Sequence, residues 1–196
     1  MSTRLCKHII RPIKLFGSTI NSSLFYIKNM ENNVIIRKYT DKDVPDMIRI
    51  WNEVVNDGIA FPQLDDLDKT SGAAFFAAQT HCGVAEETST GKILGMYILH
   101  PNNVGRCGHI ANASYAVSGE SRGLHIGEKL VKDCLEEAGK HDFRIMQFNA
   151  VVESNTHARH LYERLGFTLL GTIPEGFLMK DGHYENICVY YQTLKK

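Results

Sequence analysis

The stretch from residue 109 to 139 constrains the fold most, because its hydrophobic periodicity changes in the middle. Residues 109–117 read as an extended, mostly apolar run, and residues 118–121 interrupt it with turn-forming Ser and Gly. From Ile126 onward the apolar residues recur at helical spacing as far as Gly139, a typical helix stop. The stretch therefore predicts a strand, a polar loop and a helix in succession.

The loop that enters this helix has the composition of an anion-binding site. Gly123 and Gly127 flank the expected helix start, and glycine lets the backbone approach an anion closely. The first N–H groups of a helix have no partner within the helix and lie at the positive end of its dipole. Arg122 adds a cation that can bond two oxygens at once. Phosphate binding and an ordinary glycine-rich turn explain this stretch equally well.

The common nucleotide motifs do not fit this loop, because Glu128 stands where GxxxxGK[ST] needs a Lys and GxGxxG is absent. The segment instead resembles the acetyl-CoA loop of the GNAT family of N-acetyltransferases, with its pattern [Q/R]xxGx[G/A]. That resemblance implies that acetyl-CoA is bound by Arg122, Gly123, Leu124, His125, Ile126 and Gly127. His125 replaces the usual middle glycine. Its side chain narrows the space near the pyrophosphate, or else the residue has a negative φ and the loop becomes helical earlier.

A second segment, residues 155–167, resembles the other signature of that family, N-x-x-A-x-x-L-Y-x-x-x-G-F. The resemblance implies that Asn155 contacts the CoA arm and that Tyr162 places its phenol near the thioester sulfur. A phenol, with an ordinary pKa of ~10, is a suitable acid for a thiolate of similar basicity. The alternative is that Tyr162 only packs its ring. The resemblance also implies an oxyanion donor at the backbone N–H of Val117, where the family's strand has a bulge.

The order of the predicted elements, β-α-α-β-β-β-α-β-α-β-β, indicates an α/β (α+β) fold. The strands are expected at residues 33–38, 83–86, 93–99, 109–117, 145–152, 169–173 and 187–191. The helices are expected from a capping box at 40–43 to about 58, and at 71–79, 126–139 and 156–165. Such an order predicts a mixed central sheet of about six to seven strands, with about four helices on its two faces. It matches the GNAT fold, and the resemblance covers about residues 34–193.

Two asparagines suggest where an acceptor binds. Asn112 and Asn149 fall on two strands expected to be neighbours, and an amide can donate to a carboxylate or accept from an ammonium. Two polar residues satisfied by the backbone are an equal alternative. Several segments also resemble the fungal N-acetyltransferases of proline analogues such as azetidine-2-carboxylate, in which the two asparagines bind the substrate carboxylate. Phe61 borders the acceptor pocket by the family resemblance, or else belongs to the core.

Composition limits the remaining classes of protein. The 196 residues suffice for one domain with a single core. Because the formal net charge is zero and no apolar run spans a bilayer, neither nucleic acid nor a membrane is an expected partner. No metal site is expected, because His157 and His160 lack the HExxH spacing and read as solvated helix histidines. The five cysteines are scattered without a CxxC pair, which favours reduced thiols.

The first 29 residues differ in kind from the rest, since they contain five Lys and Arg and no Asp or Glu. We expect a dispensable leader in a cytoplasmic enzyme, followed by an acetyltransferase domain over residues 30–196. A mitochondrial presequence is the alternative, because basic, acid-free composition is typical of one. In either case, deletion of residues 1–29 should leave activity intact.

Taken together, the residues and the resemblance predict an acetyl-CoA-dependent N-acetyltransferase that transfers acetyl directly to the amine of a small molecule, such as an amino acid or proline analogue. The alternatives are a protein N-terminal or lysine acetyltransferase and a CoA-binding module without turnover. The general base stays open among His109, Glu120, Glu153 and a water chain. Many members of the family form homodimers, but nothing in the sequence selects that state.

Overall fold

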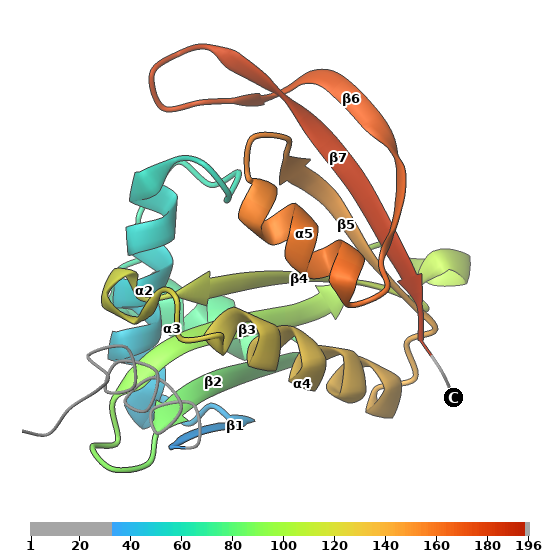
Figure 1. Cartoon of the computed structure of the whole chain (residues 1–196). Coiled ribbons are helices and arrows are strands. Elements are labelled where there is room, and N and C mark those ends of the chain that lie inside the picture. The colour runs from blue at the N-terminus through green and yellow to red at the C-terminus, as the bar shows by residue number, and fades with distance from the viewer. Residues whose placement is uncertain (1–32, 195–196) are drawn as a thin grey trace, which may run out of the picture.

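A seven-stranded sheet forms the centre of the computed structural model, which describes residues 33–194 (Figure 1). The strand order is β1-β2-β3-β4-β5-β7-β6, and every neighbouring pair is antiparallel except β4 and β5. The strands are β1 (Val34–Lys38), β2 (His81–Glu87), β3 (Ile93–Pro101), β4 (Ile110–Val117), β5 (Ile145–Val152), β6 (Thr168–Leu178) and β7 (Tyr184–Thr193). This arrangement confirms the predicted mixed sheet.

The parallel pair in the middle of the sheet is joined over only two residue pairs. Ile110 lies opposite Ile145 and Ala111 opposite Met146, and no further pair joins β4 to β5 among the described residues. Beyond these pairs β5 stays with β7 while β4 stays with β3, so the two halves of the sheet diverge (Figure 1). A gap therefore opens toward the carboxyl end of β4, which leads into the loop before the next helix.

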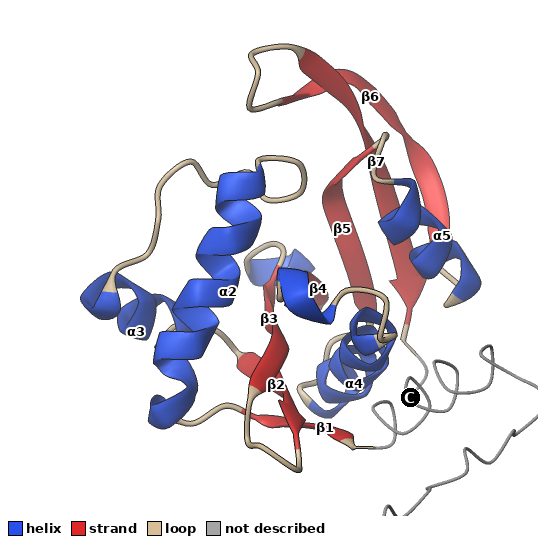
Figure 2. Cartoon of the chain, turned by 60° about the vertical axis from the view of Figure 1, so that its left-hand side comes forward, coloured by secondary structure: helices blue, strands red, loops and turns tan. Residues whose placement is uncertain are grey.

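Two helices cover each face of the sheet (Figure 2). On one face lie α2 (Val44–Asp57) and α3 (Lys69–Ala77), and on the other lie α4 (Ile126–Lys140) and α5 (Thr156–Arg164). Each pair of helices packs on its own hydrophobic cluster, so the sheet separates two cores. None of the described helices is long and apolar enough to cross a membrane.

The predicted limits of α2 follow from local signals. The predicted capping box is present at the start of a short 3₁₀ helix, Asp41–Asp43, that leads directly into α2, because the Asp43 carboxylate accepts hydrogen bonds from the backbone N–H and the hydroxyl of Thr40. The apolar stripe then buries Met47, Ile50 and Trp51 almost completely. Gly58 ends the helix with a left-handed φ of 67°, which glycine adopts without a steric penalty.

Several elements extend beyond the predicted ranges, β6 and α3 among them. Strand β6 is more than twice as long as the expected 169–173 segment, and most of it is exposed at the edge of the sheet. An edge strand need not bury one face, so its sequence lacks the alternation that reveals inner strands. Helix α3 begins at Lys69 rather than residue 71, because the Asp68 side chain caps it by accepting from the N–H groups of Thr70 and Ser71.

The thiols within the described residues are all free. Cys82, Cys134 and Cys188 are buried and Cys107 is exposed. Cys6 and the basic leader of residues 1–29, with the two interpretations given for it, lie outside the described residues.

Candidate active site

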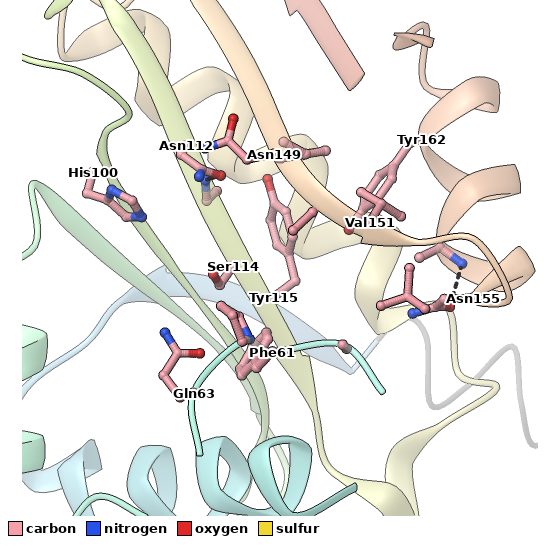
Figure 3. Close-up of a pocket in the computed structure, with 17 residues that line it drawn as sticks. Phe61, Gln63, His100, Asn112, Ser114, Tyr115, Asn149, Val151, Asn155 and Tyr162 are labelled. Carbon is pink, nitrogen blue, oxygen red and sulfur yellow. Dashed lines mark hydrogen bonds between the residues drawn. The ribbon is translucent and has the colours of Figure 1, made fainter. Parts of the chain in front are cut away.

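A cavity of about 360 Å³ opens at the gap between β4 and β5 (Figure 3). Its walls come from the end of β3, from β4, β5 and α5, and from residues 60–63 that follow α2. None of its lining residues, all of them described, is Asp, Glu, Lys or Arg. The polar groups that face it are amides, hydroxyls and one imidazole. Such a site is suited to a small molecule held by a few directed hydrogen bonds rather than by a strong field.

Two phenols line the cavity, Tyr162 from α5 and Tyr115 from β4 (Figure 3). The ring of Tyr162 lies 4.6 Å from that of Phe148 and 6.5 Å from that of Tyr115, measured between centroids. Burial of its hydroxyl raises the pKa of Tyr162 well above the ordinary value, and the nearby Cys134 adds to the effect. Tyr162 is therefore protonated at neutral pH and can donate a proton.

The two predicted asparagines lie together at the gap and share a third one. Asn112 on β4 and Asn149 on β5 each donate a side-chain hydrogen bond to Oδ1 of Asn102, at 3.4 and 2.5 Å. Asn112 is oriented by the backbone N–H of Ala113, which donates to its Oδ1 at 2.8 Å. Gln147 orients Asn149 in the same way, with its Nε2 donating at 2.8 Å. Both amide NH2 groups thus converge on one oxygen at the rim of the cavity.

Asn155 and Phe61 also line the cavity, and each has a structural role as well. Asn155 caps α5, since its Oδ1 accepts from the N–H of Ala158 at 3.2 Å. Phe61 is only 6% exposed and its ring centroid lies 4.4 Å from that of Trp51. Phe61 therefore lines the cavity and is buried against Trp51 at the same time.

The loop before α4 excludes one of the two alternatives for His125. Its φ is 54°, in the left-handed region, so the loop does not accommodate this residue through a negative φ. The chain follows the path that glycine would take, with Gly123 also left-handed at 84°, and the helix does not begin earlier but at Ile126. Histidine is among the few side chains enriched in this conformation, which explains why the loop keeps its shape without the glycine.

The bulge expected near Val117 is also absent. The register between β3 and β4 runs without a shift from Gly95 opposite Val117 to Pro101 opposite Ala111. The N–H of Ser118 donates to Leu94 of β3 at 2.9 Å, and successive N–H groups of a strand alternate between its two edges. The N–H of Val117 therefore points toward β5, which has already diverged. The gap between the strands, rather than a bulge, exposes this donor.

The end of β4 lies next to the start of α4. A Cβ at Gly127 would lie 3.8 Å from Leu161 on α5 and 4.0 Å from Val117, so Gly127 sits between α5 and the end of β4. Arg122 is exposed beside it and pairs with Asp57 at 2.6 Å. Free N–H groups at a helix start suit a diphosphate, and an open strand edge suits an amide-containing chain. The donor set therefore fits coenzyme A, with its pyrophosphate and its pantetheine amides.

The three candidate bases named from the sequence do not line the cavity. Glu120 is exposed and pairs with Lys92 at 2.7 Å, and Glu153 accepts a hydrogen bond from Asn186. His109 is exposed at the entrance to β4.

Sequence reasoning missed several polar residues of the site. His100, Gln63 and Ser114 line the cavity, and Asn102 joins the two predicted asparagines. For His100 the signal lies in the register of the sheet, which places it directly opposite Asn112.

Comparison with known proteins gives the family. A sequence model described as the acetyltransferase (GNAT) family matches residues 46–167, well over half of the chain. N-acetyltransferase aca1 of Schizosaccharomyces pombe is 36% identical over 98 residues, which cover 50% of this chain and 46% of that protein. Protein SPT10 of Saccharomyces cerevisiae is 30% identical over 87 residues, 44% of this chain and 14% of its own length. The chain thus matches less than half of the length of either curated relative.

Solved structures agree with that assignment. A GCN5-related N-acetyltransferase from Kribbella flavida superposes with a TM-score of 0.77 at 31% identity, over 83% of this chain and 99% of that one. The yncA protein of Salmonella typhimurium, solved with its cofactor acetyl-CoA, shares the fold at 21% identity and a TM-score of 0.77, over 84% and 95% of the two chains. The two sequence signatures, the divergent β4–β5 pair and the family match lead to one conclusion: the chain belongs to the acetyltransferase (GNAT) family.

Proposed function

We propose that this chain is an acetyl-CoA-dependent N-acetyltransferase that acts on the amine of a small molecule, with an amino acid or proline analogue as the favoured acceptor. The supporting observation is the convergence of the Asn112 and Asn149 amides on one oxygen at the rim of a 360 Å³ cavity that also holds Tyr162. Two NH2 groups aimed at a single oxygen are suited to a carboxylate, for which the Asn102 oxygen stands in. Catalysis takes place without a covalent enzyme intermediate.

The geometry suggests a role for each group. Bound acetyl-CoA supplies an acetyl group activated as a thioester. The N–H groups at the start of α4 and Arg122 hold the pyrophosphate, and Asn155 contacts the CoA arm. The N–H of Val117 donates to the acyl oxygen as negative charge develops on it. Tyr162, which is protonated at neutral pH, gives its proton to the departing thiolate.

A protein acetyltransferase and a CoA-binding module without turnover are the competing functions. The uncharged, amide-lined cavity favours a small acceptor, because a peptide needs an open groove beyond the attacking amine. A screen for thiol release from acetyl-CoA across amino acids, proline analogues, other amines and peptides separates the three. We expect turnover with small amino acids. Turnover with peptides alone, or with no acceptor at all, contradicts the proposal.

Tyr162→Phe tests the enzymatic interpretation directly, because only the hydroxyl is removed. We expect kcat to fall roughly ten-fold or more, since the thiolate then leaves without a proton donor. The dissociation constant of acetyl-CoA, measured by calorimetry, should change little. Tyr184→Phe is the matched control, because Tyr184 is exposed on β7 and does not line the cavity. Unchanged turnover in Tyr162→Phe would exclude the phenol from the mechanism.

A further inference from the structure

His100, at the end of β3, is the one imidazole among the lining residues of the cavity. The other titratable lining residues are Tyr115 and Tyr162, and burial raises the pKa of both. They are therefore proton donors under the conditions in which an acetyltransferase works. The remaining lining groups are amides, hydroxyls and apolar side chains. The acceptor ammonium must nevertheless lose a proton before its nitrogen can attack a thioester.

A hydrogen bond to the backbone sets the chemistry of this imidazole. Nδ1 of His100 lies 3.0 Å from the carbonyl oxygen of Pro101. A carbonyl oxygen only accepts hydrogen bonds, so Nδ1 must carry the proton. In the neutral ring this leaves the lone pair on Nε2, which is the arrangement that a general base needs. In Figure 3 the ring of His100 extends from β3 toward the cavity.

The position of His100 places it beside the proposed acceptor site. In the antiparallel register of β3 and β4 it lies directly opposite Asn112. Asn102, two residues further along, holds the amides of Asn112 and Asn149. A substrate whose carboxylate is bound by these asparagines would have its amine inside the cavity that His100 lines.

We propose that Nε2 of His100 is the general base that takes a proton from the acceptor ammonium, directly or through one water. This inference rests on the proposed function. The proton passes to His100 and later to solvent, and the neutral amine forms a bond to the thioester carbonyl carbon. The carbon–sulfur bond then breaks, and the thiolate takes the proton of Tyr162. The second proton of the attacking nitrogen restores the phenol, so the net products are the amide, CoA thiol and one released proton.

Few ionisable groups surround this imidazole. The elements around the cavity contribute Tyr115 from β4 and Tyr162 from α5, while the lining parts of β5 and of residues 60–63 contribute none. On β2, His81 lies opposite Leu99, the residue before His100. No lining carboxylate can replace His100 as the base, and no lining cation competes for its lone pair.

The test is the dependence of kcat/KM for the acceptor on pH, measured between pH 6 and 9.5 with an acceptor identified by the thiol-release screen. In the wild type we expect kcat/KM to fall with acidification as the base becomes protonated. His100→Gln should lower kcat/KM about 100-fold at pH 7, a typical contribution of a general base. The deficit should shrink toward pH 9.5, because more of the amine is then deprotonated in solution. The affinity for acetyl-CoA, by calorimetry, should stay within about two-fold of the wild type.

Two further variants serve as controls. His109→Gln changes an exposed histidine outside the cavity and should leave the pH profile as in the wild type. His100→Asn is a second variant in case His100→Gln folds poorly. It keeps a side-chain donor near the Pro101 carbonyl and should show the same loss of kcat/KM. If kcat/KM depends on pH in the same way in the His100 variants and in the wild type, His100 is not the general base. The proposed function is unaffected by that result. A loss confined to the acidic end of the range also overturns the proposal that His100 is the base, because His100 would then act as a protonated cation for the carboxylate.

A measurement on the unaltered protein is independent of activity. Long-range proton–nitrogen NMR correlations of the histidine rings report which nitrogen carries the proton. We expect neutral His100 to be protonated at Nδ1, and protonation at Nε2 would overturn the proposal. If the wild type acetylates no acceptor at any pH, the proposed function fails together with this inference. Acetyl transfer by the His100→Gln variant at pH 9.5 would show that the proposed N-acetyltransferase function holds.

Discussion

At the scale of single residues, His125 carries the most strained backbone of the candidate CoA loop. Its φ of 54° costs an L-residue about 1–2 kcal/mol, whereas glycine adopts it freely. Replacement by Gly removes this strain, and replacement by Ala keeps it. We therefore expect His125→Gly to be more stable than His125→Ala by about 1 kcal/mol in urea unfolding.

The comparison of the two variants isolates the backbone, because both lose the imidazole and any interaction it makes. Gly171→Ala is the control for a change between Gly and Ala without a left-handed backbone, at a strand position where a Cβ would meet nothing within 4 Å. An Ala variant of His125 as stable as the Gly variant would show that the loop changes its path and does not require a left-handed residue.

At the scale of elements, α5 depends on Asn155 for its start, while the same residue is proposed to contact CoA. The helix has only nine residues, and none of them is fully buried, so its cap is a large part of its support. Asn155→Ala should lower the free energy of unfolding by about 1 kcal/mol. Asn155→Asp keeps an oxygen that accepts from the N–H of Ala158, and its charge suits the helix start.

The two variants separate the capping role from the CoA contact. We expect Asn155→Asp to restore stability in urea unfolding but not the wild-type affinity for acetyl-CoA in calorimetry, because the amide donor is lost and a negative charge is added. Full recovery of both properties would mean that Asn155 acts only as a cap.

At the scale of the whole molecule, His81 links the sheet to the helices that cover it, because it lies at the start of β2 and contacts Glu137 of α4. It is 8% exposed, stacks on Tyr97 with ring centroids 5.9 Å apart, and its Nδ1 lies 3.7 Å from a Glu137 oxygen. Burial lowers the pKa of His81, although Glu137 opposes the shift. The unfolded chain therefore binds this proton more readily than the folded protein, so acidification favours unfolding.

The free energy of unfolding should accordingly fall as the pH drops from 7.5 to 5.5, with at most about 1.4 kcal/mol per pH unit from this single proton. His81→Gln should flatten the dependence, whereas His160→Gln, at an exposed position of α5, should not. Urea unfolding at several pH values measures this. Equal slopes in the wild type and His81→Gln would show that His81 does not link folding to protonation.

Local spacing in the sequence determined the elements of this protein. The capping box of Thr40 and Asp43, the apolar stripe of α2 and the left-handed stop at Gly58 all act within a few residues, so their patterns are legible in the chain. The helical spacing of apolar residues from Ile126 onward likewise predicted the start of α4, and Tyr162 lies within the predicted helix that became α5. The edge strand β6 was underestimated because exposure removes the alternation on which a strand prediction depends.

Only the tertiary structure decided how the site is assembled. The gap exists because β4 and β5 pair at two positions and then follow different neighbours, which is a choice between distant segments. The N–H of Val117 faces the β5 side of β4, where that divergence, and no bulge, has removed the pairing partner. The register of β3 on β4 places His100 opposite Asn112, and the loop after β3 brings Asn102 between two strands. Contacts between distant segments depend on strand pairing, and no local pattern of residues specifies that pairing.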